Sequence, residues 1–491
     1  MADSPISLLP VASPLLGPEL IPVVQSGITK QSTIGIAFGT SFLQAGTGAV
    51  ARTASAKMRD IINAADFGAI GDGVTNNTTF LQNALNATPT GGTLYISQGT
   101  FLFTSLTIPS GIFIQGAGKY GTVLRTTSAT LDAVLITSTT TVDFRDLAFG
   151  ATVTRTGGYY IKLISSSYNS DSAFYRVLFQ AAYNCLYFGT AAGWVITDCE
   201  FSGTVNNNIV VANTITPDAG DSAITNCIFS SANTTAVHIL QPSSGGLKVI
   251  GNKFLGGNYH YLGQFNTGAS GTSILIWEGN SSESAAAANM AFTSSASTNF
   301  SVIQITGNQF SVLTGAIGIQ IVDPGYTFID TVIINSNSFG LGASSTAINL
   351  ARGGRISLGL NLYAGNGATV TGLNLGANIV SITIAPQDFR NITTAYAGTF
   401  TNATFNPPGF ESGTITGVLT STAYASLFSS AAGTITYAKP YAKAPVVQAI
   451  PLSTGGGVSV LLGNPGLTTC TYNVIGVTSG GSTSFTWTAQ G

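Results

Sequence analysis

Two carboxylates separated by a single residue are the first candidates for chemistry in this chain of 491 residues. Asp198 and Glu200 flank Cys199 in the segment WVITDCEFSG. If this segment is one strand with Cys199 facing inward, both carboxylates face outward with Cα atoms ~6.6 Å apart. Glycosidases use a pair of carboxyl groups at comparable separations. The pair therefore predicts glycoside hydrolysis, with retaining and inverting geometry both open.

The strands that would position this pair belong to a repeat of roughly 22 to 30 residues, clearest in LKVIGNKF, VIQITGNQF and VIINSNSFG. Its aromatic position aligns at Phe149, Phe179, Phe201, Phe229, Phe254, Ser282, Phe310, Phe339 and Tyr363. Two residues earlier, the later repeats carry Asn252, Asn280, Asn308, Asn337 and Asn361. Gly251, Gly279 and Gly307 just before three asparagines predict left-handed bends. The pattern predicts stacked coils of a β-solenoid, in which the asparagines satisfy buried corners rather than bind a ligand.

The repeat also assigns neighbours to the two carboxylates. Asp198 aligns with the outward residues Asp146, Arg176 and Asn226. Arg176 on the adjacent coil, about 4.8 Å away, would keep Asp198 ionised as a base or nucleophile. Glu200 lies between Leu178 and Ile228, whose apolar side chains would favour the protonated form that a general acid needs. The alternative is a charge ladder beside a solvated glutamate.

Two rival acidic sets remain open. Asp171 and Asp221 share a column two coils apart, roughly 9.6 Å, at the wide edge of the range for inverting glycosidases. Glu278 and Glu283 form a local cluster beside Trp277, which the alignment directs inward.

An elimination mechanism would need carboxylates that bind calcium and a basic residue near the abstracted proton. Arg352 and Arg355 are available, but no acidic cluster accompanies them in the sequence. With His238 and His260 as the only histidines and no Cys/His cluster, we expect no metal site and no cofactor. A hydrolase is therefore favoured over a lyase.

Aromatic residues in or near loops provide a second signal for carbohydrate. The sequence predicts that Tyr159, Tyr160, Tyr259, His260 and Tyr261 bind substrate, because exposed rings can stack on sugar faces.

Composition excludes several classes of function. Only 7% of the residues are charged and the net charge is -2, so no basic stripe can neutralise a nucleic acid backbone. We find no apolar run long enough for a membrane span and no signal peptide in MADSPISLLPV. Four cysteines are too few for a disulfide scaffold, and Cys199 and Cys227 are expected to be buried free thiols.

Residues 57–410 carry the most specific resemblance. DFGA at 66–69 and GDG at 71–73 resemble the opening motif of the pectate-lyase-like right-handed β-helix superfamily, often found in phage tail spikes. A helix beginning near Thr78 or Thr79, with Gln82 completing a capping box, would close the end of the solenoid through its apolar face. That face consists of Phe80, Leu81, Ala84 and Leu85. The family usually has acidic residues where Asn76 and Asn77 stand, so Asp66 and Asp72 are expected to be turn residues.

The two ends of the chain differ from this repeat. In residues 1–56, ISLLPVAS, LLGPELIPVVQSG and TKQST resemble the amino-terminal segment that attaches phage tail spikes and fibres to the virion. Residues 411–491 alternate like antiparallel strands, and SFTWTAQG resembles the last strand of a β-sandwich tip that trimerises or binds receptors.

These resemblances imply an all-β homotrimeric tail spike or tail fibre in the virion tail, made in the host cytoplasm and acting at the bacterial surface. Its expected partners are a bacterial surface polysaccharide and a tail or baseplate protein. The polysaccharide would be depolymerised by an endoglycosidase or a lyase, or bound by a non-catalytic receptor-binding fibre. Apolar outward residues such as Val195, Ile276 and Ile333 are consistent with assembly.

Overall fold

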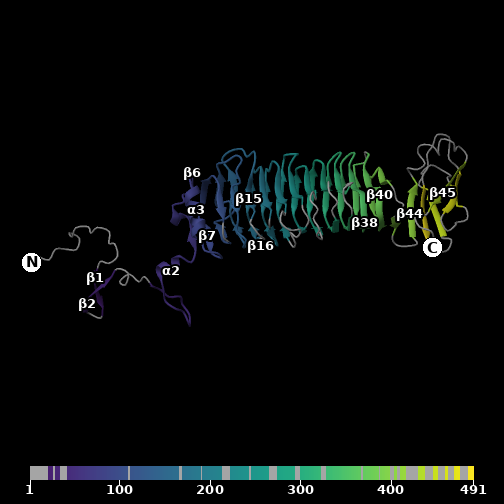
Figure 1. Cartoon of the computed structure of the whole chain (residues 1–491). Helices are drawn as coiled ribbons and strands as arrows, with labels where there is room; N and C mark the ends of the chain where they lie inside the picture. The colour runs from purple at the N-terminus through teal and green to yellow at the C-terminus, as the bar shows by residue number, and fades with distance from the viewer. Residues whose placement is uncertain are drawn as a thin grey trace, which may run out of the picture. The chain divides into compact units, whose positions relative to one another are not determined.

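The computed structural model describes most of the chain (Figure 1). The described residues are 20–25, 28–33, 41–108, 111–164, 169–189, 191–212, 222–242, 245–264, 274–293, 299–321, 328–366, 369–385, 387–398 and the strands between 403 and 490 given below. Two compact units, Met1–Asn63 and Ala64–Gly491, divide the chain and are described separately.

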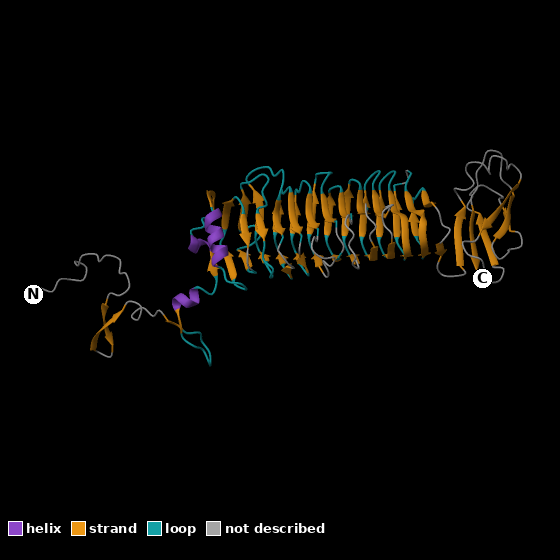
Figure 2. Ribbon diagram, viewed as in Figure 1, coloured by secondary structure: helices purple, strands orange, loops and turns teal. Residues whose placement is uncertain are grey.

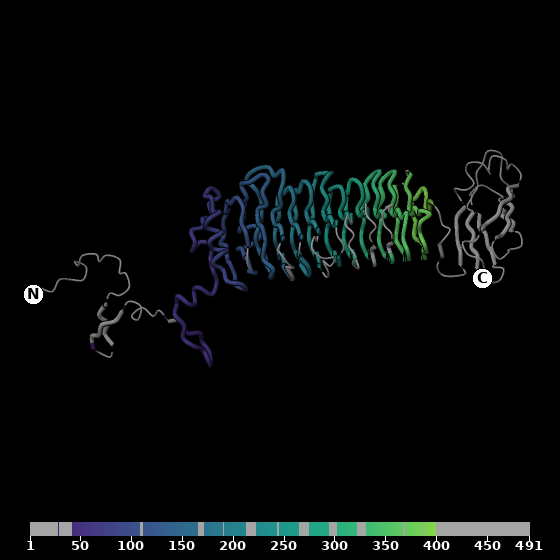
Figure 3. The backbone as a smooth tube through the Cα atoms, in the orientation of Figure 1, coloured from purple at the N-terminus to yellow at the C-terminus, as the bar shows by residue number. Residues whose placement is uncertain are grey.

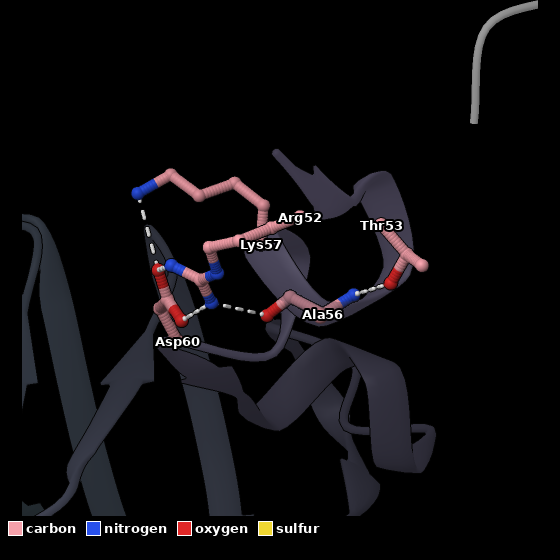
Figure 4. Close-up of polar contacts among 5 residues, drawn as sticks. All are labelled: Arg52, Thr53, Ala56, Lys57 and Asp60. Carbon is pink, nitrogen blue, oxygen red and sulfur yellow. Dashed lines mark hydrogen bonds and ion pairs between the residues drawn. The ribbon is translucent and has the colours of Figure 1, made fainter. Parts of the chain in front are cut away.

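The first unit contains short elements: β1 (Leu20–Gln25), β2 (Ile28–Thr33), β3 (Ser41–Phe42), β4 (Arg52–Thr53), α2 (Ala54–Met58) and β5 (Ile62–Asn63). Strands β1 and β2 form an antiparallel hairpin. Figure 4 shows Arg52 bonded to both Asp60 and the carbonyl of Ala56, while Thr53 caps α2 by accepting from Ala56 N. Hydrogen bonds from Arg52 and Lys57 lower the pKa of Asp60 to about 2. The predicted attachment segments before Leu20 lie outside the described residues.

The second unit is a parallel β-solenoid built from three stacks of strands (Figure 2). Sheet 1 comprises β7 (Thr93–Ile96), β10 (Phe113–Gly116), β13 (Asp143–Arg145), β17 (Ala173–Tyr175), β21 (Val195–Thr197), β24 (Ser222–Thr225), β27 (Gly246–Ile250), β30 (Ile274–Glu278), β33 (Asn299–Thr306), β36 (Phe328–Asn335), the later parts of β38 (Thr346–Leu358) and β40 (Thr371–Ile384), and β43 (Ala403–Phe405).

Sheet 2 comprises β6 (Asp72–Asn76), β8 (Gly99–Phe103), β11 (Thr122–Thr126), β14 (Ala148–Ala151), β18 (Leu178–Gln180), β22 (Glu200–Ser202), β25 (Ile228–Ser231), β28 (Lys253–Gly256), β31 (Ser281–Ala285), β34 (Gln309–Val312), β37 (Ser338–Leu341), β39 (Leu362–Gly365) and β41 (Asp388–Arg390). Sheet 3 comprises β9 (Leu106–Ile108), β12 (Val134–Ile136), β15 (Tyr159–Leu163), β19 (Asn184–Phe188), β23 (Asn207–Val211), β26 (Val237–Gln241), β29 (Tyr259–Gly263), β32 (Ala288–Phe292), β35 (Ile317–Ile321), the earlier parts of β38 and β40, and β42 (Thr394–Gly398). Two short strands, β16 (Asn169–Ser170) and β20 (Ala191–Ala192), pair beside these stacks.

The strand register confirms the predicted aromatic column. Phe149 pairs with Phe179, Phe179 with Phe201, and the pairing continues through Ser282 to Tyr363. Consecutive rings stack, as between Phe201 and Phe229, whose centroids are 4.6 Å apart. Figure 3 shows the regular succession of coils that this stacking requires.

The asparagine column is a buried hydrogen-bonded ladder, as predicted. Asn280 Oδ1 accepts from Asn252 N at 2.8 Å, and the same bond recurs between successive asparagines up to Asn361. The preceding corner is left-handed on nearly every coil, with φ values of 67° at Gly251, 63° at Gly279 and 69° at Gly307. Glycine adopts this conformation without strain, which explains its repetition there.

Helix α3 (Thr78–Ala87) closes the first coil, as predicted. It buries Leu81, Ala84 and Leu85. The predicted capping box is wrong: the helix begins after Asn77, and Gln82 instead bonds both the N–H and the carbonyl of Thr107 in β9. Gln82 thereby satisfies backbone groups at the open edge of sheet 3.

The turn before α3 is organised by its polar side chains, as predicted for Asp72. Its carboxylate accepts from Val74 N and Thr75 N at 2.8 Å, and hydrogen bonds from Thr75 and Val74 lower its pKa to about 2. Asn77 is fully buried and bonds the N–H and the carbonyl of Ile70.

The last strands are antiparallel, as predicted. β44 (Phe410–Ile415), β49 (Phe485–Gln490) and β46 (Val446–Pro451) form one sheet, and β45 (Ser430–Thr436), β48 (Thr469–Ile475) and β47 (Ser459–Leu462) form another. Their side chains lie outside the described residues, so the sandwich packing stays a prediction.

In the described part, Cys185, Cys199 and Cys227 are buried free thiols, and no helix is long and apolar enough to cross a membrane.

Candidate functional site

Asp198 and Glu200 lie on one corner of the solenoid, but not on one strand. β21 ends at Thr197 and β22 begins at Glu200. Asp198 occupies the left-handed corner with φ of 55° and is exposed, while Cys199 points inward. The predicted strand spacing between the two carboxylates is therefore wrong, because the chain turns between them.

Arg176 does not pair with Asp198 as the column suggested. Its Nε and Nη2 donate to the two carboxylate oxygens of Asp146, one coil earlier, at 2.6 and 2.8 Å. Asp146 and Arg176 have φ values of 56° and 51°, so they share the corner geometry of Asp198. Asp146 and Arg176 therefore form a charge ladder, which was the alternative to a catalytic role for this column.

Glu200 has the predicted sheet neighbours but also an unexpected cation. Leu178 and Ile228 pair with Glu200 on the adjacent strands. Lys119 Nζ lies 3.2 Å from Glu200 Oε2, and the hydroxyl of Tyr120 lies 3.4 Å from the same oxygen. This ion pair is a contact that the column of Leu178 and Ile228 did not predict.

Sheet 1 carries a buried carboxylate, Asp143, that the sequence did not single out. Asp143 accepts from Ala173 N and from Arg145 Nη2, both at 3.0 Å. Arg145 lies over the ring of Tyr175, 4.7 Å from its centroid. Burial raises the pKa of Asp143 above its ordinary value. One feature of the sequence could have identified Asp143: it is an acidic residue at the start of a strand, and its partners on the neighbouring strands, Phe113 and Ala173, are apolar.

Of the rival acidic sets, only Glu278 and Glu283 can be compared, and they lie on different sheets. Asp171 is exposed, with φ of 60°, and its Oδ1 lies beside Gly193. Asp221 lies outside the described residues. Glu278 is exposed at the end of β30, whereas Glu283 accepts from Ser281 and lies 3.9 Å from Lys253 on sheet 2. Trp277 points inward and is fully buried, as predicted.

Three of the predicted sugar-stacking residues are in the core, so that assignment is wrong for them. Tyr160, His260 and Tyr261 are each 0% exposed. Tyr160 and Tyr261 donate to Gln180 O and Gln241 Oε1, while His260 Nε2 contacts Gly256 O at 3.0 Å. Tyr159 and Tyr259 remain partly exposed on sheet 3.

Residues 61–259 match a protein family described as rhamnogalacturonase A/epimerase, pectate lyase-like. This part of the chain is thus similar to pectate-lyase-like proteins in sequence and forms a parallel β-helix. The tail spike protein of Shigella phage Sf6 is 38% identical over 129 residues, which cover 24% of this chain and 20% of the tail spike. A capsule K30/K69-specific depolymerase of Klebsiella phage K64-1 is 28% identical over 160 residues, 28% of this chain and 21% of the depolymerase. The matches thus span about a fifth of the length of each curated relative.

A solved structure extends the likeness in fold. A variant of the tailspike protein of Escherichia coli bacteriophage HK620 superimposes with a TM-score of 0.51 and 12% identity. The alignment covers 92% of this chain and 97% of that chain. At this identity, the likeness supports the architecture of the β-helix and carries no information on the site.

The β-helix has a second group of aromatic and charged side chains on sheet 3. The rings of Tyr159 and Tyr187 are 5.1 Å apart, and Lys162 Nζ lies within 6 Å of both centroids and 3.1 Å from Asp132 Oδ2. Burial raises the pKa of Tyr159 to about 12. Two aromatic rings with a hydrogen-bond donor and an acceptor beside them are the kinds of group that can contact a sugar.

Inside the β-helix, two histidines on adjacent coils share one acceptor. His238 Nε2 and His260 Nε2 contact Gly256 O at 3.2 and 3.0 Å. Asn208 Nδ2 donates to His238 Nδ1 at 2.7 Å, and Asn289 Nδ2 to His260 Nδ1 at 3.3 Å. These contacts fit two neutral rings, and burial lowers the pKa of both. The described residues contain no group of three or more His, Cys, Asp or Glu side chains that could hold a metal.

Proposed function

We propose that this protein is a phage tail spike or tail fibre that binds a bacterial surface polysaccharide along its β-helix and cleaves it at the corner carrying Glu200. The observation that supports this most directly is the similarity of part of the chain to the Sf6 tail spike and the K64-1 capsule depolymerase. Residue types at the corner agree with glycoside hydrolysis, which needs two carboxyl groups and no metal.

In this proposal the roles of the two carboxylates are the reverse of those suggested by sequence. Glu200, paired with Lys119 at 3.2 Å, acts as base or nucleophile. Asp198, exposed at the same corner, is the candidate for the acid, because glycosidic cleavage requires a proton donor to the leaving oxygen. Hydrolysis therefore remains favoured over elimination.

A non-catalytic receptor-binding fibre is the second candidate. The contact that favours it is the ion pair itself, because Lys119 and Tyr120 engage Glu200 as a structural partner would. In that case the same surface would bind the polysaccharide without cleaving it.

We further propose the assembly that the resemblance of the chain ends implies. Residues 5–35 would attach the protein to a tail or baseplate protein, and residues 411–491 would form the tip. A homotrimer in the virion tail would then present three copies of the corner surface to the bacterium.

The test is incubation of the purified protein with capsule or lipopolysaccharide from candidate hosts. Binding is measured by sedimentation with the polysaccharide, and cleavage by new reducing ends and by the absorbance of unsaturated uronates. Reducing ends without that absorbance support a hydrolase, and binding without any product supports the receptor-binding fibre. If no candidate host polysaccharide binds, the proposed function is wrong. Cleavage that survives in both Asp198→Asn and Glu200→Gln would move the site elsewhere while the function stands.

A further inference from the structure

The loop between β10 and β11, residues 117–121, reaches Glu200 across two intervening strands. On sheet 2, Val123, Ala148, Leu178 and Glu200 are in register on successive strands. The loop directly precedes the strand of Val123, yet Lys119 and Tyr120 contact Glu200, three strands further along.

Burial along this column shows where the loop passes. Ala148 and Leu178 face outward, because the buried Phe149 and Phe179 that follow them face inward. They are nevertheless only 1% and 2% exposed, whereas Ile228, the next residue of the column beyond Glu200, is 44% exposed. This outward column of sheet 2 is therefore covered at Ala148 and Leu178, before Glu200, and open at Ile228, beyond it.

The base of the loop is fixed to the β-helix. Gly118 N donates to Asp146 O at 2.8 Å, and Thr122 Oγ1 accepts from Ala117 N at 2.8 Å and donates to Ser97 O at 2.9 Å. A Cβ at Gly116 would lie 2.4 Å from Asp146 O, so this close approach requires glycine. The tip is thus presented on an ordered base, as a binding element requires.

Both tip residues use the same oxygen of Glu200. Lys119 and Tyr120 contact Oε2, and Oε1 has no hydrogen bond among the described residues, so Oε1 is the oxygen that can face a substrate. Tyr120 is 70% exposed although it lies beside a carboxylate and within 5.2 Å of Lys119 Nζ. An exposed ring next to polar groups is suited to stacking on a sugar while its neighbours bond the hydroxyls.

We propose that residues 117–121 form one wall of the polysaccharide site, in which Tyr120 stacks on a sugar ring and Lys119 positions Glu200. This inference rests on the proposed function and adds residues that the sequence did not identify. The ligand is a polysaccharide unit lying across the corner at Glu200, with one ring face on Tyr120.

The first experiment compares Tyr120→Ala, Tyr120→Phe and wild type in binding to a host polysaccharide fragment by titration calorimetry. Loss of the ring in Tyr120→Ala should weaken the Kd about tenfold, the size expected for an aromatic contact. Tyr120→Phe keeps the ring and should stay within about twofold of wild type. Val380→Ala, at a side chain that is also 70% exposed but near the far end of the β-helix, is the matched control.

The second experiment tests Lys119 as a positioning residue by measuring kcat and KM separately. Lys119→Met should lower kcat about tenfold while KM changes less than about twofold, because Glu200 loses the contact that orients it, and Lys119→Arg should restore kcat. A Tyr120→Ala protein that folds and binds like wild type overturns the assignment of the ring, while the proposed function stands. If wild type binds no host polysaccharide, both proposals fall.

Discussion

Lys119 Nζ and Glu200 Oε2 lie 3.2 Å apart although the two residues are 81 positions apart in sequence. The repeat alone did not predict this ion pair at the corner. This contact brings an ion pair and the exposed Tyr120 together at one corner, which is why we propose Glu200 rather than Asp198 as the base or nucleophile.

Substitution of Glu200 should slow cleavage much more than substitution of Asp146 in the neighbouring charge ladder. Glu200→Gln removes the ionised group and should lower kcat by about 10²–10⁴-fold, the usual contribution of a positioned acid or base. Asp146→Asn weakens the pairing with Arg176 but should change kcat by less than about threefold, because this pair is a structural charge ladder. Initial rates of reducing-end formation measure both. Equal losses in the two variants would contradict the assignment of the site to Glu200.

The asparagine ladder should contribute directly to stability. Asn308→Ala removes the acceptor of Asn280 N and the donor to Trp277 O in a fully buried column. Each buried group left unpaired costs about 1–3 kcal/mol, so the free energy of unfolding should fall by about 2 kcal/mol or more. Chemical denaturation measures the change.

Asn374→Ala is the control for the ladder. Its side chain bonds Asn349 on the partly exposed face of sheet 3, where water can replace the lost partner. We expect a change within about 0.5 kcal/mol. A ladder variant no less stable than this control would mean that the buried amides are compensated by other groups.

The columns of the β-helix could be predicted from sequence, because each coil repeats one inward aromatic and one buried amide at constant spacing. The alternation rule failed at sheet 3, where Tyr160 and Ile161 are both buried although they are consecutive. The register with β19 is constant from Tyr159–Asn184 to Ile161–Leu186, so Tyr160, which alternation would expose, is buried without any shift in strand pairing.

The corner site could be predicted only in part. The repeat placed Glu200 between Leu178 and Ile228. It treated Asp198 as a strand residue, because a left-handed corner cannot be recognised from the sequence when its residue is not glycine. Lys119 could not be found, because the path of a loop across sheet 2 depends on tertiary contacts rather than on the period.

Acid should destabilise the β-helix through its two buried histidines. The pKa of His238 is lowered to about 4 by burial, and that of His260 is also lowered, while an unfolded histidine titrates near 6.5. The unfolded chain therefore binds more protons between about pH 6.5 and 4, and stability must fall as pH decreases through this window. These are the only two histidines in the chain, and Asp143, whose pKa is raised by burial, acts on stability in acid with the opposite sign, so the comparison with a histidine variant is what identifies their contribution.

The matched variant for this effect is His238→Gln, which keeps a polar side chain beside Asn208 and Gly256 without the titration. It should reduce the slope of stability against pH between 6.5 and 4 by about half, since one of two protons is removed. Asp72, whose pKa is lowered to about 2, contributes only at more acid pH. An unchanged slope would show that the histidines are not protonated on unfolding in this range.

The cap of the β-helix should depend on the apolar face of α3. Leu85 is 3% exposed and faces Leu94 and Leu106 at the end of the solenoid. Leu85→Ala should lower the free energy of unfolding by about 2–5 kcal/mol, because the end of a stacked solenoid cannot readily collapse into the space that the side chain leaves. Thr79→Ala, at an exposed position of the same helix, is the control and should change it by less than about 0.5 kcal/mol. Urea unfolding followed by circular dichroism separates the two, and equal midpoints would mean that α3 does not stabilise the first coil.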